Sequence, residues 1–392
     1  MSSNYFEWRK HQNIRPLKLK NKEKFYSDLI NIEHSWSGRM DTNVGNTFIM
    51  EAEQQLINAI ELYELGYFDC AYYSLRSAID LSTTMVFLCD LPDNDRGKYL
   101  KDWKNIEDFP LRGTMIAKLK KANNVFCDMY DKMPNFFNRA HVLSSRLNKF
   151  VHKQGLVQFY VSRNHPIYGN KSDINFIEDF ESDLKECIAV VAVMRLAIDP
   201  FPVLLMDEEI LYRCFDSLTE PYSENFVSEY IGKDIIEEYK TTDIYRGTYK
   251  SFENEEKKNQ TVFDIMKHQY INTTKKDDIF AQLHLLPIHD IISTVIALSC
   301  DKVVKVYTMD GLLMYFTDKN TNRTKHSWSG ADFKKFQEPI EKINQPYDEA
   351  FISVFNFDNE YYFAEHNELL DQDDVTNINE YTHQVMLKYN VQ

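Results

Sequence analysis

The residues best suited to chemistry lie in the stretch 144–155, which reads SSRLNKFVHKQG. It places Arg146 and His152 six positions apart. An imidazole titrates near neutral pH and can move a proton, whereas a guanidinium stays charged and can bind a phosphate. Together these groups can perform acid–base chemistry on a phosphodiester without a metal ion. This stretch indicates a reaction more directly than any other part of the chain.

The spacing predicts that residues 135–154 form the helix that positions these groups. The polar residues on one face of that helix are Ser145, Asn148, Lys149 and His152. Arg146 lies about 120° from His152 around the helix axis, so its long side chain has to bend back to reach the same face. The alternative interpretation is a solvated helix face that carries a histidine by chance.

An apolar helix expected earlier in the chain carries Arg76 and Asp80 one turn apart. The pattern consists of an apolar helix with an acid late in it, Asp80, then a long insert, and then a helix that carries Arg146 followed by His152. This order resembles the HEPN superfamily over about residues 46–199. Members of that superfamily are all-α domains, and many are metal-independent ribonucleases that act as toxins or antiviral effectors. They usually carry a polar residue directly after the arginine, where this chain has Leu147, with Asn148 one position later.

The resemblance implies a role for each residue of the motif. His152 would act as general base or acid at the RNA, and Arg146 would bind the scissile phosphate. Asp80 would orient one of these two side chains, or else it forms a simple surface ion pair with Arg76. Asn148 and Lys149 would help to position the phosphate. Active sites in the superfamily form across a homodimer interface, so the resemblance also implies a homodimer.

Positive charge is concentrated around the same stretch. Lysines and arginines balance acids over residues 1–200, and residues 201–392 carry the whole net charge of −15. Residues 115–153 hold eight basic residues and only two acids. A polyanion such as RNA would meet this part of the chain, with Arg139 and Lys153 as further substrate-binding candidates. The alternative is a solvated basic face.

The composition predicts a soluble, cytoplasmic protein. The six cysteines are scattered without a close pair, which excludes a CxxC zinc or redox motif and argues against a disulfide framework. The chain begins without the apolar stretch of a signal peptide, and no stretch of 18 uncharged apolar residues occurs. We therefore expect no association with a membrane.

Apolar periodicity predicts an all-α bundle of four or five helices over residues 46–200. Residues 1–45 should form a basic N-terminal arm, over about residues 1–24, and an entry segment. The expected helices are residues 46–65, 69–88, 111–129, 135–154 and 179–199, with Asp69 as N-cap of the second. Pro200 marks the expected boundary between this bundle and the next domain. Residues 201–392 should form an acidic α+β module with a small antiparallel sheet. Its hairpins are expected over residues 303–318 and 351–365, with a helix over residues 331–343 between them.

Other motifs carry less chemistry. His284, His289 and Asp290 have a loose metal-like spacing, but a proline interrupts it and no further ligand completes the set. The acidic run 371–374 lacks the glycine and the final glutamate of a calcium loop. The pentapeptide HSWSG occurs at 34–38 and 326–330 with unrelated flanks, and we interpret this as coincidence. No cofactor motif is present, so we expect neither a metal nor a cofactor.

The sequence therefore predicts a HEPN-like, metal-independent endoribonuclease. Such a protein would act on RNA as a toxin or antiviral effector, and its C-terminal module would regulate it or bind a protein or ligand partner. The alternative is a non-catalytic, dimerising interaction protein in which the Arg–His motif is structural.

Overall fold

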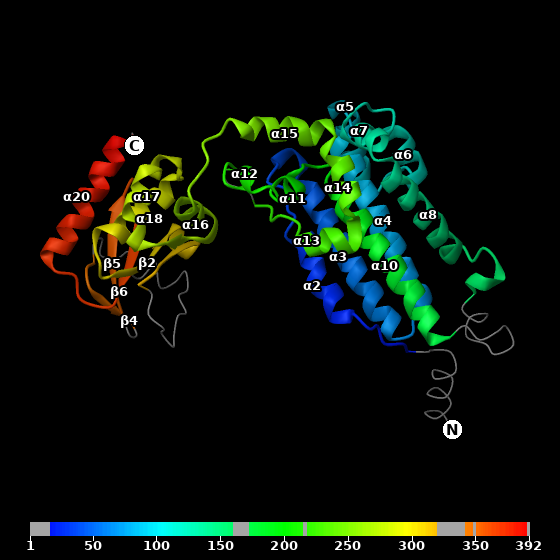
Figure 1. Cartoon of the computed structure of the whole chain (residues 1–392), viewed down its shortest axis with the longest axis horizontal. Coiled ribbons are helices and arrows are strands. Elements are labelled where there is room, and N and C mark those ends of the chain that lie inside the picture. The colour runs from blue at the N-terminus through cyan, green and yellow to red at the C-terminus, as the bar shows by residue number, and fades with distance from the viewer. Residues whose placement is uncertain (1–15, 160–171, 215–217, 320–341, 348–349, 390–392) are drawn as a thin grey trace, which may run out of the picture. The chain divides into compact units, whose positions relative to one another are not determined.

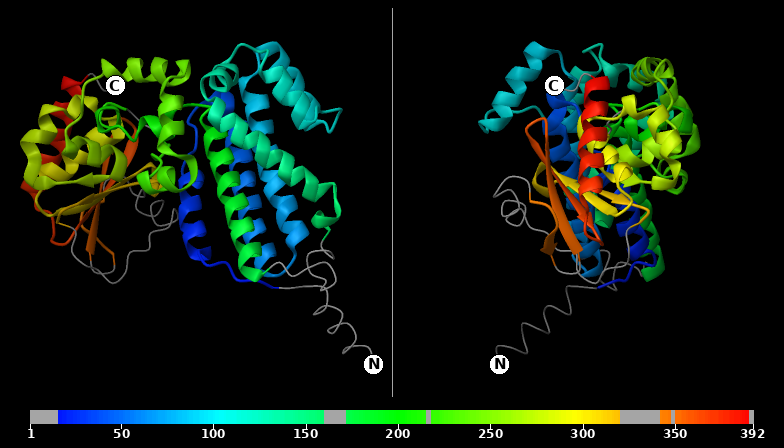
Figure 2. Two further views of the ribbon diagram at one scale, coloured as in Figure 1. Left: turned by 45° about the vertical axis from the view of Figure 1, so that its right-hand side comes forward. Right: turned by 90° about the vertical axis from the view of Figure 1, so that its left-hand side faces the viewer.

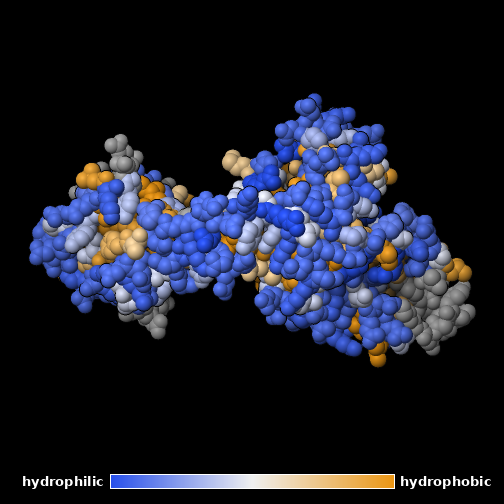
Figure 3. All heavy atoms as spheres, turned by 45° about the horizontal axis from the view of Figure 1, so that its top comes forward, coloured by the Kyte–Doolittle hydropathy of each residue, from blue (hydrophilic) through white to orange (hydrophobic). Residues whose placement is uncertain are grey.

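The computed structural model describes residues 16–159, 172–214, 218–319, 342–347 and 350–389. The chain divides into two compact units, Met1–Glu255 and Glu256–Gln392 (Figure 1). The first unit is helical and the second is an α+β module, as the sequence predicts. Among the described residues, no helix is both long and apolar enough to cross a membrane. The face in Figure 3 is mainly hydrophilic, and its apolar residues form small separate patches.

The first unit is built around one central helix, α4. The long helices of this unit are α2 (Lys22–Glu33), α3 (Asn43–Glu64), α4 (Phe68–Asp90), α8 (Pro134–Val151) and α10 (Asp173–Arg195). Helix α4 packs against α3, α8 and α10 (Figures 1 and 2). Its apolar residues occur on almost every side, and its buried positions extend from Phe68 to Asp90. A helix that is apolar all round has to be enclosed by others, which places α4 in the core.

Two local expectations for this bundle are wrong. The N-cap of α4 is Tyr67, and Asp69 lies in the first turn instead, where it pairs with the Nζ of Lys153 at 2.6 Å. Residues 111–129 do not form one helix, because Asn123 adopts a left-handed φ of 58°. That backbone conformation separates α6 (Arg112–Leu119) from α7 (Val125–Lys132). A further helix, α5 (Asp93–Lys104), begins directly after Pro92.

The first unit extends past Pro200 to Glu255. The elements of this extension are α11 (Phe201–Leu204), α12 (Glu208–Leu211), α13 (Glu224–Phe226), the π-helical turn η4 (Val227–Ile231), α14 (Lys233–Lys240) and α15 (Asp243–Glu253). Their apolar residues join the core of the bundle. The buried hydroxyls of Tyr222 and Tyr239 donate to backbone carbonyls of α10 and the residue after it, at 3.0 and 2.9 Å. A boundary at Pro200 would expose this shared core.

The second unit contains a six-stranded sheet in the order β1-β3-β2-β6-β5-β4. The strands are β1 (Tyr270–Ile271), β2 (Val303–Thr308), β3 (Leu313–Thr317), β4 (Gln345–Tyr347), β5 (Ala350–Phe357) and β6 (Glu360–His366). Among these described strands, β1 and β3 pair in parallel and the other neighbours are antiparallel. Both expected hairpins form, and Asp358 and Asn359 take the left-handed φ values, 53° and 59°, that a tight hairpin turn requires.

Helices complete the second unit. They are α16 (Gln260–His268), α17 (Lys276–Ala281), α18 (Ile288–Ser299) and α20 (Gln372–Lys388). Helix α18 packs against both β2 and α20, and together they enclose a core separate from that of the bundle. The expected helix over residues 331–343 falls largely outside the described residues.

The first copy of the HSWSG pentapeptide has a structural role. The carbonyl of Ser35 accepts a hydrogen bond from the buried guanidinium of Arg195, and Ser37 exchanges two backbone hydrogen bonds of 2.9 Å with the side chain of Asn46. These contacts fix the approach to α3. The second copy, residues 326–330, lies outside the described residues.

Candidate functional site

Helix α8 carries the Arg–His motif, and its end is held firmly against α4. Leu147 is fully buried, and the ring of Phe150 stacks on Tyr72 of α4 with centroids 4.0 Å apart and planes 4° apart. His152 is the C-cap residue of the helix, and its backbone N–H donates to the carbonyl of Asn148 at 2.9 Å. The side chain of His152 is exposed. A packed helix end therefore presents an accessible imidazole.

The two predicted arginines of α8 both pair with acids of α10. Arg146 forms an ion pair with Asp183, a carboxylate that is only 5% exposed. Arg139 makes two bonds to the carboxylate of Glu186, at 3.0 and 3.3 Å. Because the acids are three positions apart on α10, they face the same side of that helix. These ion pairs fasten α8 to α10.

A groove of about 360 Å³ lies beside these ion pairs. Its lining residues are Asn138, Arg139, Val142, Leu143, Arg146, Ser182 and Glu186. His152 is not among them. The groove therefore contains one partner of the predicted catalytic pair, and the imidazole lies beyond it at the end of the helix.

A second set of polar residues, which we term the arginine cluster, lies where α4, α6 and α8 meet. It consists of Arg76, Asp80, Arg112, Ser144 and Asn148. The Nε of Arg76 donates to the Oδ1 of Asn148 at 2.8 Å, and its Nη1 pairs with Asp80. The Nη1 of Arg112 donates to the Oγ of Ser144 at 2.9 Å, and its Nε lies 3.8 Å from the Oδ1 of Asp80. Two guanidinium groups thus share one carboxylate.

The arginine cluster carries more positive than negative charge in a partly buried place. The side chains of Arg76 and Arg112 are each 16% exposed. Burial lowers the pKa of the Arg112 guanidinium to about 10, and the charge of Arg76 acts in the same direction, while Asp80 opposes both. Arg112 is still protonated at neutral pH. Two adjacent cations with one carboxylate are suited to binding an anion such as phosphate.

The arginine cluster reaches the neighbourhood of His152 through Asn148. Asn148 and His152 are four positions apart on α8, so their side chains leave the helix on one face about 6 Å apart. Since Asn148 binds Arg76, a guanidinium of α4 lies at the helix position one turn before His152. Arg112 was not predicted from the sequence, because no spacing relates it to residues more than 30 positions away.

The remaining predicted residues have separate surroundings. Asp80 pairs with Arg76, which is the simpler of the two interpretations offered by the sequence. Lys153 has a left-handed φ of 51° and is bound to Asp69, so it ties the end of α8 to the start of α4. Lys149 is exposed.

The metal-like motifs are engaged in other contacts. His284 pairs with Glu256 at 3.2 Å, whereas the Nδ1 of His289 lies 3.2 Å from the hydroxyl of Tyr362. Asp371 is the N-cap of α20, where it forms a capping box with Asp374. In the part of the chain that the structure describes, no three His, Cys, Asp or Glu side chains come together as a metal site.

Comparison of the chain with protein-family models, with curated proteins and with solved structures found no match.

Proposed function

We propose that the first unit is a metal-independent endoribonuclease of the HEPN type, acting as a toxin or antiviral effector under the control of the second unit. The observation that supports this most is the arginine cluster, in which two guanidinium groups share one carboxylate. Its link through Asn148 to the helix that ends in the exposed His152 brings an anion-binding group close to a proton-transfer group. A phosphodiester needs both for cleavage.

In the proposed reaction the substrate supplies its own nucleophile. The 2′-oxygen of the ribose attacks phosphorus as its proton passes to His152. The bond from phosphorus to the 5′-oxygen breaks, and water protonates the leaving oxygen. Arg76 and Arg112 bind the non-bridging oxygens and stabilise the charge that develops there. We assign phosphate binding to this pair because Asp183 neutralises Arg146.

The central experiment measures RNA cleavage by the full-length protein in EDTA. We expect products with 2′,3′-cyclic phosphates and no cleavage of DNA, which lacks the nucleophile. His152→Ala should reduce the rate about 100-fold or more, the usual range for lost acid–base help. The matched control is His141→Ala, an exposed histidine of the same helix, which should leave the rate unchanged. Activity that is lost on chelation, or that is equal in wild type and His152→Ala, would refute the proposal.

A second candidate function is a non-catalytic, dimerising interaction protein. The observation that favours it is the pairing of Arg146 and Arg139 with acids of α10, which gives these arginines a structural role without any substrate. Light scattering at micromolar concentration tests dimerisation. A stable dimer without RNA cleavage, and with the same mass for the His152→Ala variant, would support this candidate over the nuclease.

A further inference from the structure

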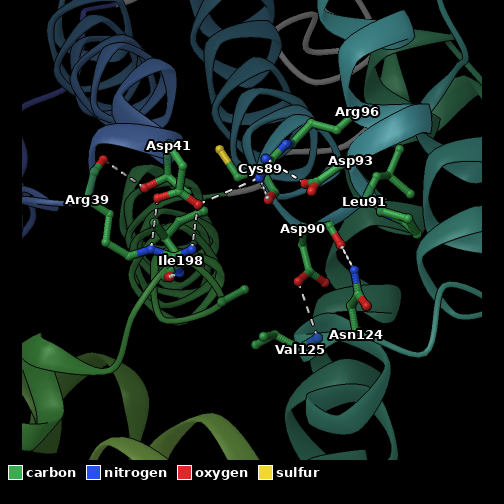
Figure 4. Close-up of a pocket in the computed structure, with 13 residues that line it drawn as sticks. Arg39, Asp41, Cys89, Asp90, Leu91, Asp93, Arg96, Asn124, Val125 and Ile198 are labelled. Atoms are coloured by element: carbon green, nitrogen blue, oxygen red, sulfur yellow. Dashed lines mark hydrogen bonds and ion pairs between the residues drawn. The ribbon is translucent and has the colours of Figure 1, made fainter.

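A cavity near the end of α4 lies away from the arginine cluster. Its volume is about 550 Å³, within the range of small-molecule sites. Figure 4 shows the charged side chains around it: Arg39 and Asp41 precede α3, Asp90 ends α4, and Asp93 and Arg96 belong to α5. The lining residues that carry the argument are Arg39, Asp41, Cys89, Asp90, Asp93 and Arg96. Asp90 is ten residues beyond Asp80 on α4, so the cavity lies about 15 Å from the arginine cluster.

Both arginines of the cavity are already neutralised. Arg39 makes a two-point contact with Asp41, at 2.7 and 3.2 Å. Arg96 pairs with Asp93 at 2.7 Å and lies 3.7 Å from Asp41 (Figure 4). An incoming anion would have to displace these carboxylates. The cavity is therefore poorly suited to an anionic ligand.

Asp90 is the carboxylate of the cavity that lacks a cation. It is 8% exposed, and its two oxygens accept hydrogen bonds from the backbone N–H groups of Val125 and Phe126 at 3.2 and 2.8 Å. No ion pair to Asp90 occurs among the described residues. With three carboxylates and two arginines, the lining has an excess of one negative charge. A buried carboxylate with this surplus favours a positively charged ligand.

Helix C-termini and helix N-termini both border the cavity: α5 begins at Asp93 and α7 begins at Val125, so their partial charges offset each other in part. Helices α4 and α10 both end here, and the C-terminal end of a helix carries partial negative charge. The chain already places cations on the carbonyls at these ends. Arg96 donates to the carbonyl of Cys89 at 3.4 Å, and Arg39 donates to that of Ile198 at 2.7 Å. Each of these carbonyls can accept a second hydrogen bond, from the cation of a ligand.

We propose that this cavity binds a small organic cation, an ammonium or guanidinium group on a short aliphatic chain, with its charge against Asp90. The aliphatic part would contact the apolar part of the lining, which consists of Leu91, Pro92, Val125, Ala197 and Ile198. Because the cavity is separate from His152 and the arginine cluster, the proposal does not depend on ribonuclease activity.

The test is calorimetric titration of the full-length protein with agmatine at pH 7.5. We expect saturable binding that Asp90→Asn weakens at least 10-fold. Asp93→Asn is the matched control: Asp93 is 88% exposed, so water and salt screen its charge and the loss should stay below 3-fold. Arg39→Gln should tighten binding several-fold, because it removes one positive charge from the lining and leaves the carboxylate of Asp41 without its two-point partner. Thermal unfolding checks that each variant is folded, since Asp90 also holds the start of α7.

The wild type supplies a second measurement that does not depend on any variant. Burial raises the pKa of Asp90 to about 6, against the lowering effect of its two backbone hydrogen bonds and of Arg39. The other charged or titratable groups around it are Asp41, Asp93, Arg96 and Cys89. Agmatine should therefore bind more weakly at pH 5 than at pH 7.5. Absence of binding at millimolar agmatine, tighter binding of glutamate than of agmatine, or equal affinity in wild type and Asp90→Asn would overturn the proposal.

Discussion

At the scale of single residues, burial decides which ionisable groups respond to pH. Glu53 on α3 is 9% exposed and surrounded by the core of the bundle. Burial raises the pKa of its carboxyl to about 7, and the nearby charge of Glu33 adds to the effect. The folded state therefore holds a proton on Glu53 that the unfolded chain releases at lower pH.

This residue predicts a change of stability with pH. Since the folded pKa is above the unfolded value, the contribution of neutral Glu53 is fully present below about pH 4.5 and is lost as pH rises through 7. Glu53→Gln should stabilise the protein at pH 8 by on the order of 1 to 3 kcal/mol and have little effect at pH 4.5. Denaturant unfolding at both pH values measures this. Glu51→Gln, an exposed glutamate on the same helix, is the control, and an equal effect of both variants would contradict the assignment.

At the scale of elements, the position of α8 depends on polar contacts as well as on its apolar face. Stacking of Phe150 on Tyr72 joins it to α4, and two ion pairs join it to α10. The two ion pairs differ in burial. The side chain of Asp183 is 5% exposed, whereas that of Glu186 is 31% exposed. Only the first should contribute much to stability.

Removal of Arg146 should therefore have mainly a structural effect. We expect Arg146→Ala to lower the free energy of unfolding by about 2 to 4 kcal/mol, because the buried carboxylate of Asp183 loses its cation. Arg139→Ala, the matched control, should cost less than about 1 kcal/mol. Adding Asp183→Asn to Arg146→Ala should restore part of the loss.

The same variants separate structure from catalysis. Under the proposed function, Arg146→Ala should, below its melting temperature, keep more RNA-cleaving activity than Arg76→Lys, which loses the planar fork beside Asn148. If Arg146→Ala lost more of this activity than Arg76→Lys, Arg146 would be the residue that binds the phosphate.

At the scale of the whole molecule, each unit has a main hydrophobic core of its own among the described residues, and the second unit has a further small cluster of Tyr307, Ile352, Val354 and Phe363. The main core of the helical unit includes residues up to Tyr245, and that of the second unit lies between the sheet and its helices. The units meet in the chain between α15, which ends at Glu253, and α16, which begins at Gln260. Each unit thus has the core that independent folding requires.

A fragment of residues 1–255 should fold by itself. We expect helical circular dichroism and a single cooperative thermal transition, because the elements after Pro200 complete the core of the bundle. A fragment of residues 1–200 should be far less stable, since it lacks the buried Tyr222 and Tyr239. Equal melting temperatures for the two fragments would show that the extension is not part of the folding unit.

The sequence by itself determined the type of most elements, but not the break at Asn123 within residues 111–129 or the extension of the first unit past Pro200. Apolar spacing of 3.6 residues identified the bundle, and a change to alternation around Asp-Gly and Asp-Asn turns identified both hairpins, because such patterns depend on near neighbours in the chain. Only the tertiary structure decided which side chains of the candidate site form ion pairs and hydrogen bonds with one another. Asp183 is 37 positions from Arg146, and Arg76 is 72 positions from Asn148. The packing of helices against one another sets such pairs, and no local spacing encodes it.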